Sequence, residues 1–222
     1  MRPAWALLCA AALCRAEEGL VYGEAGGEIL TMDYYPAAGK GPHPAAILIH
    51  GGGFVGGNSK NPSEAYCADF LAPAGYAVFS INYRGGSAGG WLSNLAGVRK
   101  RRAIPGASDP VDRASARVQA VVTLYGPSDF RNREIGGNLK ALLGPLAEKK
   151  GVEAALAEAS PVMHITGEEP PFLLIHGDQD ASVPIAQSTH LQAALKAGHV
   201  RCDLIIIRGG GHGTGRWHKV PG

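Results

Sequence analysis

The sequence predicts an α/β fold in a single domain. Short, continuous apolar runs bounded by glycine or proline recur along the chain, which is typical of strands buried on both faces. Helix-like segments alternate with these runs, and this alternation favours a largely parallel sheet with helices on both faces. The chain has 222 residues, of which 45% are hydrophobic and 18% are charged, enough for one domain with a buried core. No internal repeat or linker divides the sequence, so we expect residues 17–222 to form one domain.

The first half of the domain is expected to begin with a hairpin and to continue with alternating strands and helices. Residues 20–24 and 28–35 have the pattern of paired strands, with Gly26 and Gly27 at the turn between them. Residues 45–50 form an apolar run between a proline and a group of glycines, as a buried strand does. The next elements expected are a helix at 61–74, a strand at 76–83 and a helix that starts at Gly90.

The second half continues the alternation, with two interruptions. Residues 103–116 are polar and broken by prolines, which indicates a loop. Residues 138–159 carry two weak helices, which we expect to be separated at Gly144–Pro145. The remaining elements expected are strands at 118–125, 171–176 and 202–208 and an amphipathic helix at 185–197.

The N-terminus has the pattern of a secretory signal peptide. Arg2 supplies a positive charge, and residues 4–13 form an apolar run too short to span a bilayer as a helix. Small residues at the positions that a signal peptidase recognises suit cleavage after Ala16. We therefore expect residues 1–16 to be removed and the protein to be secreted or periplasmic, with no membrane anchor left.

Charge and residue spacing argue against several kinds of binding partner. The net charge of +2 is too small to indicate a protein that binds nucleic acid, and we interpret the basic cluster at 99–102 as a solvated loop. The eight histidines are scattered and lack the close pairing of a metal site, so no metal is expected. Signal cleavage leaves Cys67 and Cys202, and export would permit a disulfide between them without requiring one.

Ser87 is the candidate nucleophile of an acyl-transfer enzyme. It lies in the segment GGSAG at 85–89, between a predicted strand and a predicted helix. A sharp turn of this kind holds a serine hydroxyl above the sheet, and the flanking glycines permit the bend. A serine between glycines is more often an ordinary turn residue, so the assignment depends on the other members of a catalytic group.

His212 and Asp180 are the candidate base and the candidate acid that orients it. Both follow predicted strands, in the order serine, aspartate, histidine along the chain. His212 lies in a glycine-rich loop that can reach over the sheet edge, whereas Asp180 taken alone could simply cap the next helix. Asp178 is a rival for the acid, but we prefer Asp180 because a Val-Pro pair follows it, as in related enzymes. Asp129 is a weaker rival that we expect to be structural.

Gly52, Gly53 and Ala88 are the expected donors to the oxyanion of a tetrahedral intermediate. Consecutive glycines after the strand at 45–50 let backbone N–H groups face a cavity without obstruction by side chains. His50 is expected to be a structural hydrogen-bonding residue. A phosphate-binding loop is the alternative, but the Lys-Ser or Lys-Thr pair of such a loop does not follow, and the spacing is not that of a dinucleotide site.

The chain resembles the α/β-hydrolase esterases of the lipase/acetylhydrolase type, including the group named for bifunctional acetylxylan and feruloyl esterases. The resemblance covers nearly everything after the signal peptide. It implies a carboxylic ester hydrolase that needs no cofactor and acts on small-molecule or polysaccharide esters, such as acetyl or feruloyl groups on carbohydrate. The matching motifs are HGGGF at 50–54, INYR at 81–84, GGSAGG at 85–90, YGPSDF at 125–130, ASPVMHIT at 159–166, HGDQDASVP at 176–184 and GGGHG at 209–213.

The sequence departs from this family in ways that bear on the site. In relatives a loop, a helix and a strand separate the INYR motif from the serine turn, whereas here Gly85 follows Arg84 directly. We therefore expect one central strand, its crossover helix and the final helix to be missing. A sheet closed over that gap would move Ser87 about one strand spacing, ~5 Å, away from the loops of Asp180 and His212.

Three functions remain as hypotheses after this comparison. The first is a secreted serine carboxylesterase that works through Ser87, His212 and Asp180 and an acyl-enzyme. The second is a truncated relative that is catalytically impaired or inactive. An exopeptidase built on the same triad is less favoured, because the chain carries no propeller or other gating domain.

Overall fold

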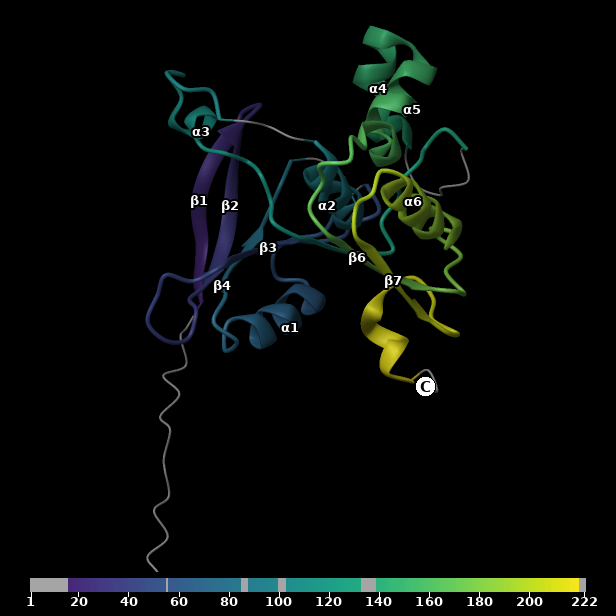
Figure 1. Ribbon diagram of the computed structural model, residues 1–222. Helices are drawn as coiled ribbons and strands as arrows, with labels where there is room; N and C mark the ends of the chain where they lie inside the picture. Colours follow the sequence, from purple (N-terminus) through teal and green to yellow (C-terminus); the bar gives the residue numbers. More distant parts are fainter. Residues whose placement is uncertain (1–15, 55, 85–87, 100–102, 133–138, 220–222) are drawn as a thin grey trace, which may run out of the picture.

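The computed structural model describes residues 16–54, 56–84, 88–99, 103–132 and 139–219. Its strands form two separate groups with helices around and between them (Figure 1). One is a four-stranded sheet in the order β1-β2-β4-β3, and the other is a three-stranded sheet in the order β5-β6-β7. We call them sheet A and sheet B. The expected fold class, an incomplete α/β sheet with helices, is confirmed.

Sheet A begins as a hairpin and ends as a parallel pair. β1 pairs with β2 and β2 pairs with β4 in antiparallel fashion, whereas β3 and β4 are parallel, with Ala45 opposite Ala77 and Ile49 opposite Ile81. The hairpin turns at Gly26 and Gly27, which both have a positive φ, as only glycine adopts readily. The four strands are β1 (Glu17–Ala25), β2 (Glu28–Tyr35), β3 (Ala45–Ile49) and β4 (Ala77–Ile81).

Sheet B is entirely parallel. Val121, Phe172 and Cys202 lie side by side at the start of its strands, so all three strands have their carboxyl ends at one edge. Each strand is short and apolar, as expected for strands that face helices. The strands are β5 (Val121–Leu124), β6 (Phe172–Gly177) and β7 (Cys202–Ile207).

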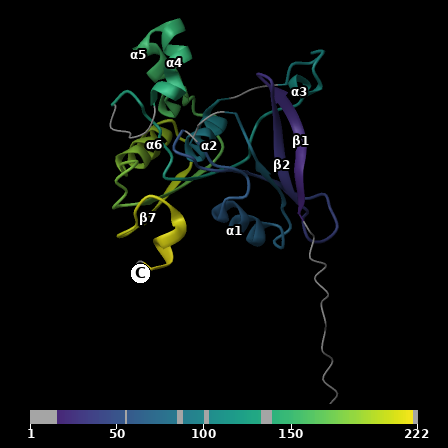
Figure 2. The same cartoon turned by 180° about the vertical axis from the view of Figure 1, so that it is seen from behind.

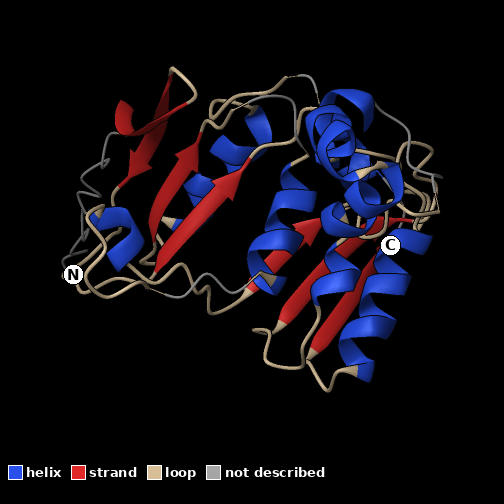
Figure 3. Cartoon of the chain, turned by 90° about the horizontal axis from the view of Figure 1, so that it is seen from above, coloured by secondary structure: helices blue, strands red, loops and turns tan. Residues whose placement is uncertain are grey.

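The two sheets meet at the start of helix α2 (Gly89–Val98) rather than through a β ladder. Within the described residues, no pairing joins β3 to β5. A Cβ atom at Gly89 would lie 2.0 Å from the carbonyl oxygen of Ile49, and one at Gly90 would lie 2.7 Å from that of Leu124. The first turn of α2 therefore contacts the carboxyl ends of both β3 and β5, and the two groups of strands stand apart on either side of a helix (Figure 3). The gap falls where the sequence predicts a missing strand.

The other helices pack on the sheets or project from them. α1 (Pro62–Leu71) packs on β3 and β4, and α6 (Ala186–Ala197) packs on β6 and β7. α4 (Leu139–Lys150) and α5 (Val152–Ala159) pack on each other and project at the end of the molecule away from α1 (Figure 2). Two 3-10 helices, η1 (Pro161–His164) and η2 (Thr214–Lys219), complete the described elements apart from a short helix described below.

Two predicted features of the helices are wrong. The helix α4 runs through Gly144–Pro145, and the break between α4 and α5 lies instead at Gly151, whose φ of 86° ends the right-handed helix. The expected loop at 103–116 contains a short helix, α3 (Pro110–Arg113). Pro110 suits the first turn of a helix, and the Asp109 carboxylate accepts a hydrogen bond from the Val111 N–H at 2.8 Å.

The buried core lies between sheet B and its helices, and a second cluster lies under α2. The second cluster combines three aromatic rings packed edge to face, Phe54, Trp91 and Phe130, with aliphatic residues of α4 and α5. The core of sheet B consists of Val98, Val121, Phe172, Leu174, Leu191, Leu195, Val200 and Cys202. Because α2 contributes Trp91 to one cluster and Val98 to the other, the same helix joins the two hydrophobic clusters.

The opposite face of sheet B is exposed. Val122 and Ile205 belong to this face and are 54% and 47% exposed, and Ile47 on β3 is 57% exposed. The helices α2 and α6 pack on the other face of sheet B, through Val98, Leu191 and Leu195. Among the described helices none is long and apolar enough to cross a membrane. The predicted signal peptide lies outside the described residues except for Ala16.

Candidate active site

Asp180 and His212 form a hydrogen-bonded pair at the carboxyl edge of sheet B. Asp180 lies on the loop after β6, and His212 lies on the loop after β7. Their side chains meet with His212 Nδ1 2.8 Å from Asp180 Oδ2. The carboxylate is fully buried, whereas the imidazole is 41% exposed. Because a carboxylate can only accept, Nδ1 donates, and Nε2 is left with a lone pair that can take a proton.

The two loops are also joined through their backbones. The Gln179 N–H donates to the carbonyl of Gly210 at 2.9 Å. Gly177 approaches the same carbonyl so closely that a Cβ atom there would lie 2.1 Å from it. Glycine at 177 is therefore required for the contact that places Asp180 beside His212.

The Asp180 carboxylate is held in its ionised form. Its Oδ1 atom accepts hydrogen bonds from the N–H groups of Ser182 at 2.8 Å and Val183 at 2.9 Å. Burial acts to raise the pKa of Asp180, but the hydrogen bonds from Val183, His212 and Ser182 outweigh it and leave the pKa below its usual value. Each oxygen of the carboxylate thus has its own role, one toward its loop and one toward the histidine.

A second, fully buried histidine lies behind the pair. His176 Nε2 donates to the Val183 carbonyl at 2.8 Å and lies 3.4 Å from Asp180 Oδ2. Its Nδ1 atom bonds to the hydroxyl of Ser188 at 2.7 Å. Burial lowers the pKa of His176, so the ring is neutral at pH 7. His176 therefore fixes the Asp180 loop without adding a charge.

The two rival acids lie elsewhere. Asp178 Oδ1 accepts the N–H of Gly209 at 2.7 Å, so its carboxylate serves the turn between the loops. The Asp129 carboxylate forms an ion pair with Arg131 at 2.7 Å. Neither of them bonds to His212 among the contacts of the described residues, so Asp180 is the acid that the structure places beside the histidine.

The candidate oxyanion loop follows β3. Gly53 has a φ of 58°, and the carbonyl of Gly52 accepts the N–H of Gly56 at 3.1 Å, which closes the loop on itself. A Cβ atom at Gly52 would lie 1.5 Å from the carbonyl oxygen of Gly56, so this turn excludes every other residue type at 52. The loop is thus a compact glycine turn at the carboxyl end of β3.

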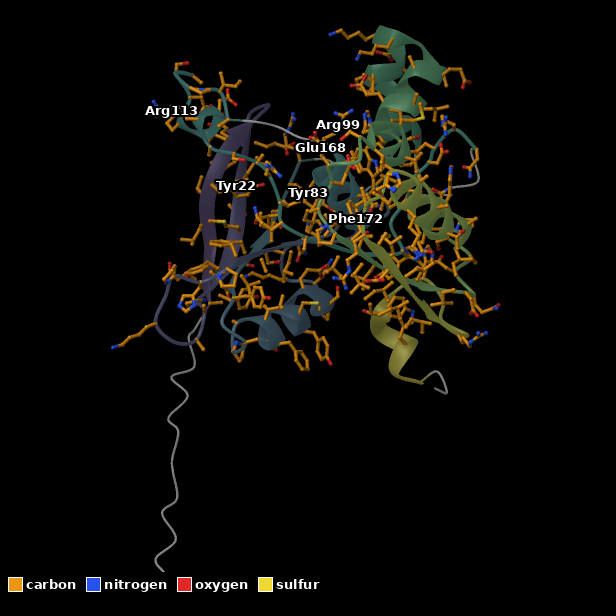
Figure 4. The ribbon with its side chains drawn as sticks, viewed as in Figure 1. Tyr22, Tyr83, Arg99, Arg113, Glu168 and Phe172 are labelled. Atoms are coloured by element: carbon orange, nitrogen blue, oxygen red, sulfur yellow. The ribbon has the colours of Figure 1, made fainter. Side chains whose placement is uncertain are left out.

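His50 and Tyr83 hold the base of this loop. The two rings stack with their centroids 4.3 Å apart, and the Tyr83 hydroxyl donates to the carbonyl of His50. His50 Nδ1 donates to the carbonyl of Gly51 at 2.8 Å, which agrees with the structural role expected for His50. Tyr83 lies two residues after β4, near the middle of the molecule (Figure 4).

The third expected donor, Ala88, is the residue before α2, and Ser87 lies outside the described residues. Ala88 has an extended backbone, and its carbonyl accepts the first helical hydrogen bond, from Leu92, at 3.0 Å. The next residue, Gly89, touches the carbonyls of Ile49 and His50. The start of α2 therefore lies directly beside the glycine loop, on the side of the molecule that also carries the Asp180–His212 pair.

Sequence reasoning missed two aromatic residues that contact the histidine region. The rings of Tyr125 and His212 lie 4.5 Å apart, and Trp217 packs edge to face on Tyr125 at 5.6 Å. Tyr125 opens the YGPSDF motif and directly follows a strand, which is the one signal in the sequence that could have marked it. Within the described residues no cluster of histidine, cysteine or acidic side chains could hold a metal, and Cys67 and Cys202 are unpaired.

The BD-FAE family profile matches residues 32–84 and 85–195, which together make up more than half of the chain. The match divides between Arg84 and Gly85, where the sequence predicts the missing segment. Two esterases of Mycobacterium tuberculosis are also similar: LipM, a probable carboxylic ester hydrolase, and LipC. LipM is 29% identical over 67% of this chain and 44% of its own length. LipC is 26% identical over 87% of this chain and 59% of its own length.

The similarity to these relatives is partial in length. The chain spans 44% of the length of LipM and 59% of the length of LipC. The alignment with LipC extends over 246 residues, more than the 222 of this chain. LipC therefore has residues inside the aligned region that are missing here.

Solved structures of esterases share the fold. A truncated form of a carbohydrate esterase from gut microbiota has a TM-score of 0.74, with 24% identity over 91% of this chain and 90% of that one. An acetyl ester-xyloside bifunctional hydrolase from Caldicellulosiruptor lactoaceticus has a TM-score of 0.75, with 23% identity over 86% of this chain and 82% of that one. Together, the matched residues, the relatives and the fold place the chain in the BD-FAE family of α/β-hydrolase esterases.

Proposed function

We propose that this chain is a secreted carboxylic ester hydrolase that works through Ser87, His212 and Asp180. The observation that carries this proposal is the 2.8 Å hydrogen bond between His212 Nδ1 and the buried Asp180 carboxylate. It fixes the tautomer in which Nε2 is free to accept a proton, as a general base beside a serine requires. Membership of an esterase family supports ester hydrolysis as the reaction.

In this mechanism the Ser87 hydroxyl oxygen attacks the ester carbonyl carbon as its proton passes to His212 Nε2. The electron pair of the carbonyl moves to its oxygen, which accepts hydrogen bonds from the N–H groups of Gly52, Gly53 and Ala88. Collapse of the intermediate expels the alcohol, which takes the proton from His212, and leaves an acyl-serine. Water then attacks the acyl carbon as its proton passes to His212. Collapse of this second intermediate breaks the bond to Ser87, which takes the proton back from His212, and releases the carboxylic acid.

The substrates we propose are short acyl esters, with acetyl or feruloyl groups on carbohydrate among them. The names of two solved relatives, a carbohydrate esterase and an acetyl ester-xyloside hydrolase, support this class. A third relative, an esterase from Thermogutta terrifontis, was solved with propionate bound, which supports a small acyl group. Export is supported by the predicted signal peptide, because the first strand of the domain starts at Glu17, directly after the expected cleavage site.

A fluorophosphonate probe, which reacts covalently with an activated serine, tests the proposal together with hydrolysis of 4-nitrophenyl acetate. We expect one probe molecule per chain, located at Ser87 by peptide mass mapping. The Ser87→Ala variant should lose labelling and at least ~10³-fold in kcat/KM. Ser108→Ala, a change at an exposed serine on the loop before α3, serves as the matched control and should behave as the parent protein does. Equal hydrolysis by the parent protein and by Ser87→Ala would overturn the proposal.

A second candidate is a member of this family that does not catalyse hydrolysis. The observation in its favour is the absence of a ladder between β3 and β5 in the described residues, which divides the scaffold between the glycine loop and the Asp180–His212 pair. A folded parent protein that neither labels with the probe nor hydrolyses the ester would favour this second candidate.

A further inference from the structure

We propose that Tyr125 is a positioning residue for His212, and that Trp217 supports it from behind. The Asp180 hydrogen bond fixes one atom of the imidazole but leaves the ring able to rotate about that bond. A second contact is needed to define where Nε2 points, and the half-exposed imidazole receives it from the ring of Tyr125, 4.5 Å away and inclined by 56°. The catalytic meaning of this contact rests on the proposed function, whereas the contact itself does not.

Trp217 ties the aromatic contact to the histidine loop. Its ring meets Tyr125 edge to face at 5.6 Å, with an angle of 86° between the planes. Its indole N–H donates to the carbonyl of Gly211 at 3.0 Å, one residue before His212. Tyr125, Trp217 and the histidine loop therefore all contact one another. Trp217 bonds to the backbone of the loop, and Tyr125 packs on the side chain of His212.

Tyr125 is itself fixed by its backbone. Its N–H donates to the carbonyl of Ile175 within β6, at 2.9 Å. Its φ of 42° lies in the left-handed region, which a tyrosine rarely adopts, and residues held in such conformations gather at functional sites. This conformation directs the chain into Gly126, where a Cβ atom would lie 2.5 Å from the carbonyl carbon of Gly90 in α2.

Tyr125 thus connects the first turn of α2 with His212, which no β ladder joins among the described residues. Through Gly126 it touches the first turn of α2, and through its ring it touches His212. Burial raises the pKa of Tyr125, so the phenol is neutral at pH 7. The ring therefore acts by its shape and its aromatic surface rather than by a charge.

The test compares Tyr125→Phe, which keeps the ring, with Tyr125→Leu, which fills part of the volume but removes the aromatic contact. The first readout is the rate at which diethyl pyrocarbonate modifies His212, measured by peptide mass mapping. His199 on the α6–β7 turn, which is exposed, serves as the internal reference. We expect His212 to react several-fold faster relative to His199 in Tyr125→Leu and at the parent rate in Tyr125→Phe. Trp217→Leu should give a smaller change in the same direction.

The second readout is the hydrolysis of 4-nitrophenyl acetate. Tyr125→Leu should lower kcat by about 10- to 100-fold, with KM changed by less than about threefold, because a small displacement of a catalytic group affects the chemical step. Tyr125→Phe should restore kcat. Unchanged modification of His212 in both Tyr125→Leu and Trp217→Leu would overturn the proposal. If the parent protein has no esterase activity but His212 is modified faster in Tyr125→Leu, the proposed function is contradicted and the positioning role of Tyr125 is supported.

Discussion

The two carboxylate oxygens of Asp180 have different partners and different roles. Oδ1 accepts the N–H groups of Ser182 and Val183 and so shapes its own loop, whereas Oδ2 accepts from His212. His176 completes the surroundings of the carboxylate from the buried side. The residue that orients the histidine therefore also stabilises the turn that presents it, and a change at this position affects folding and chemistry through different atoms.

We expect Asp180→Asn to remain folded but to lose about 10⁴-fold in kcat, a magnitude taken from the general behaviour of such triads. The amide can keep an oxygen toward Ser182 and Val183, but its NH₂ group then faces His212 Nδ1. That forces the proton of the imidazole onto Nε2, which can no longer accept the serine proton. Steady-state kinetics with 4-nitrophenyl acetate measure the loss, and activity within tenfold of the parent protein would contradict it.

The same pair of proteins tests the pH dependence of stability. Because the pKa of Asp180 is lowered in the folded state from its unfolded value of about 3.9, the ionised carboxylate stabilises the fold above about pH 4. That contribution is lost as the pH falls through the lowered pKa. Urea unfolding should therefore show the largest difference between parent and Asp180→Asn at neutral pH. The expectation fails if the difference is the same from pH 7 down to pH 3.

At the scale of elements, the far end of the glycine loop is anchored by a buried polar network. The Ser59 hydroxyl donates to Asp33 on β2 at 2.7 Å, and its N–H donates to the side-chain oxygen of Asn82 at 2.8 Å. The Ser80 hydroxyl on β4 donates to the carbonyl of Ser59 at 2.8 Å. Ser59 is thus bonded through three of its groups, so strands β2 and β4 determine where the oxyanion loop ends.

Ser59→Ala should destabilise the protein by ~1–3 kcal/mol, because it removes one donor from the buried Asp33 carboxylate. The backbone bonds of residue 59 remain, so we expect the loop to persist with a modest fall in kcat. Urea unfolding and ester hydrolysis measure the two effects. Ser108→Ala, at an exposed position, is the control and should change neither; a Ser59→Ala protein as stable as this control would rule out the anchoring role.

The sequence alone predicts the strands and the Asp180–His212 pair. It does not predict features that depend on contacts between residues far apart in the chain. Apolar runs bounded by glycine or proline locate every strand to within a few residues, and chain order singles out Asp180 and His212. The break predicted at Gly144–Pro145 was wrong because α4 continues through Pro145 in its interior, whereas Gly151 has the positive φ that ends the helix. The ring contact between Tyr125 and His212 joins residues far apart in sequence, so no local pattern could reveal it.

At the scale of the whole molecule, the exposed face of sheet B is an apolar surface. The register places Val122, Leu173 and Asp203 side by side, with Ile175 and Ile205 in the next row. Asp203 is the one charged residue among these five positions. An exposed apolar sheet face of this kind favours association between molecules.

We expect the protein to associate at micromolar concentrations and the double variant Val122→Lys, Ile205→Lys to do so less. The two lysines place like charges on the exposed face, which disfavours contact between copies. Sedimentation velocity over a range of concentrations measures the shift. Val111→Lys, which changes a residue on α3 that is 70% exposed, is the matched control and should associate as the parent does. A parent protein that stays monomeric at every concentration would contradict the expectation.

The contacts at Gly89 and Gly90 also determine how freely the two halves of the site can move relative to each other. A β ladder fixes neighbouring strands in translation and in rotation, because it repeats hydrogen bonds along its length. Two close contacts at one turn of a helix fix position at that point but leave rotation about it less restricted. The aromatic cluster of Phe54, Trp91 and Phe130 restricts that rotation, because it packs the end of the glycine loop against α2 and against the chain after β5. The first turn of α2 and this cluster together hold the oxyanion loop in place relative to the acid–histidine pair.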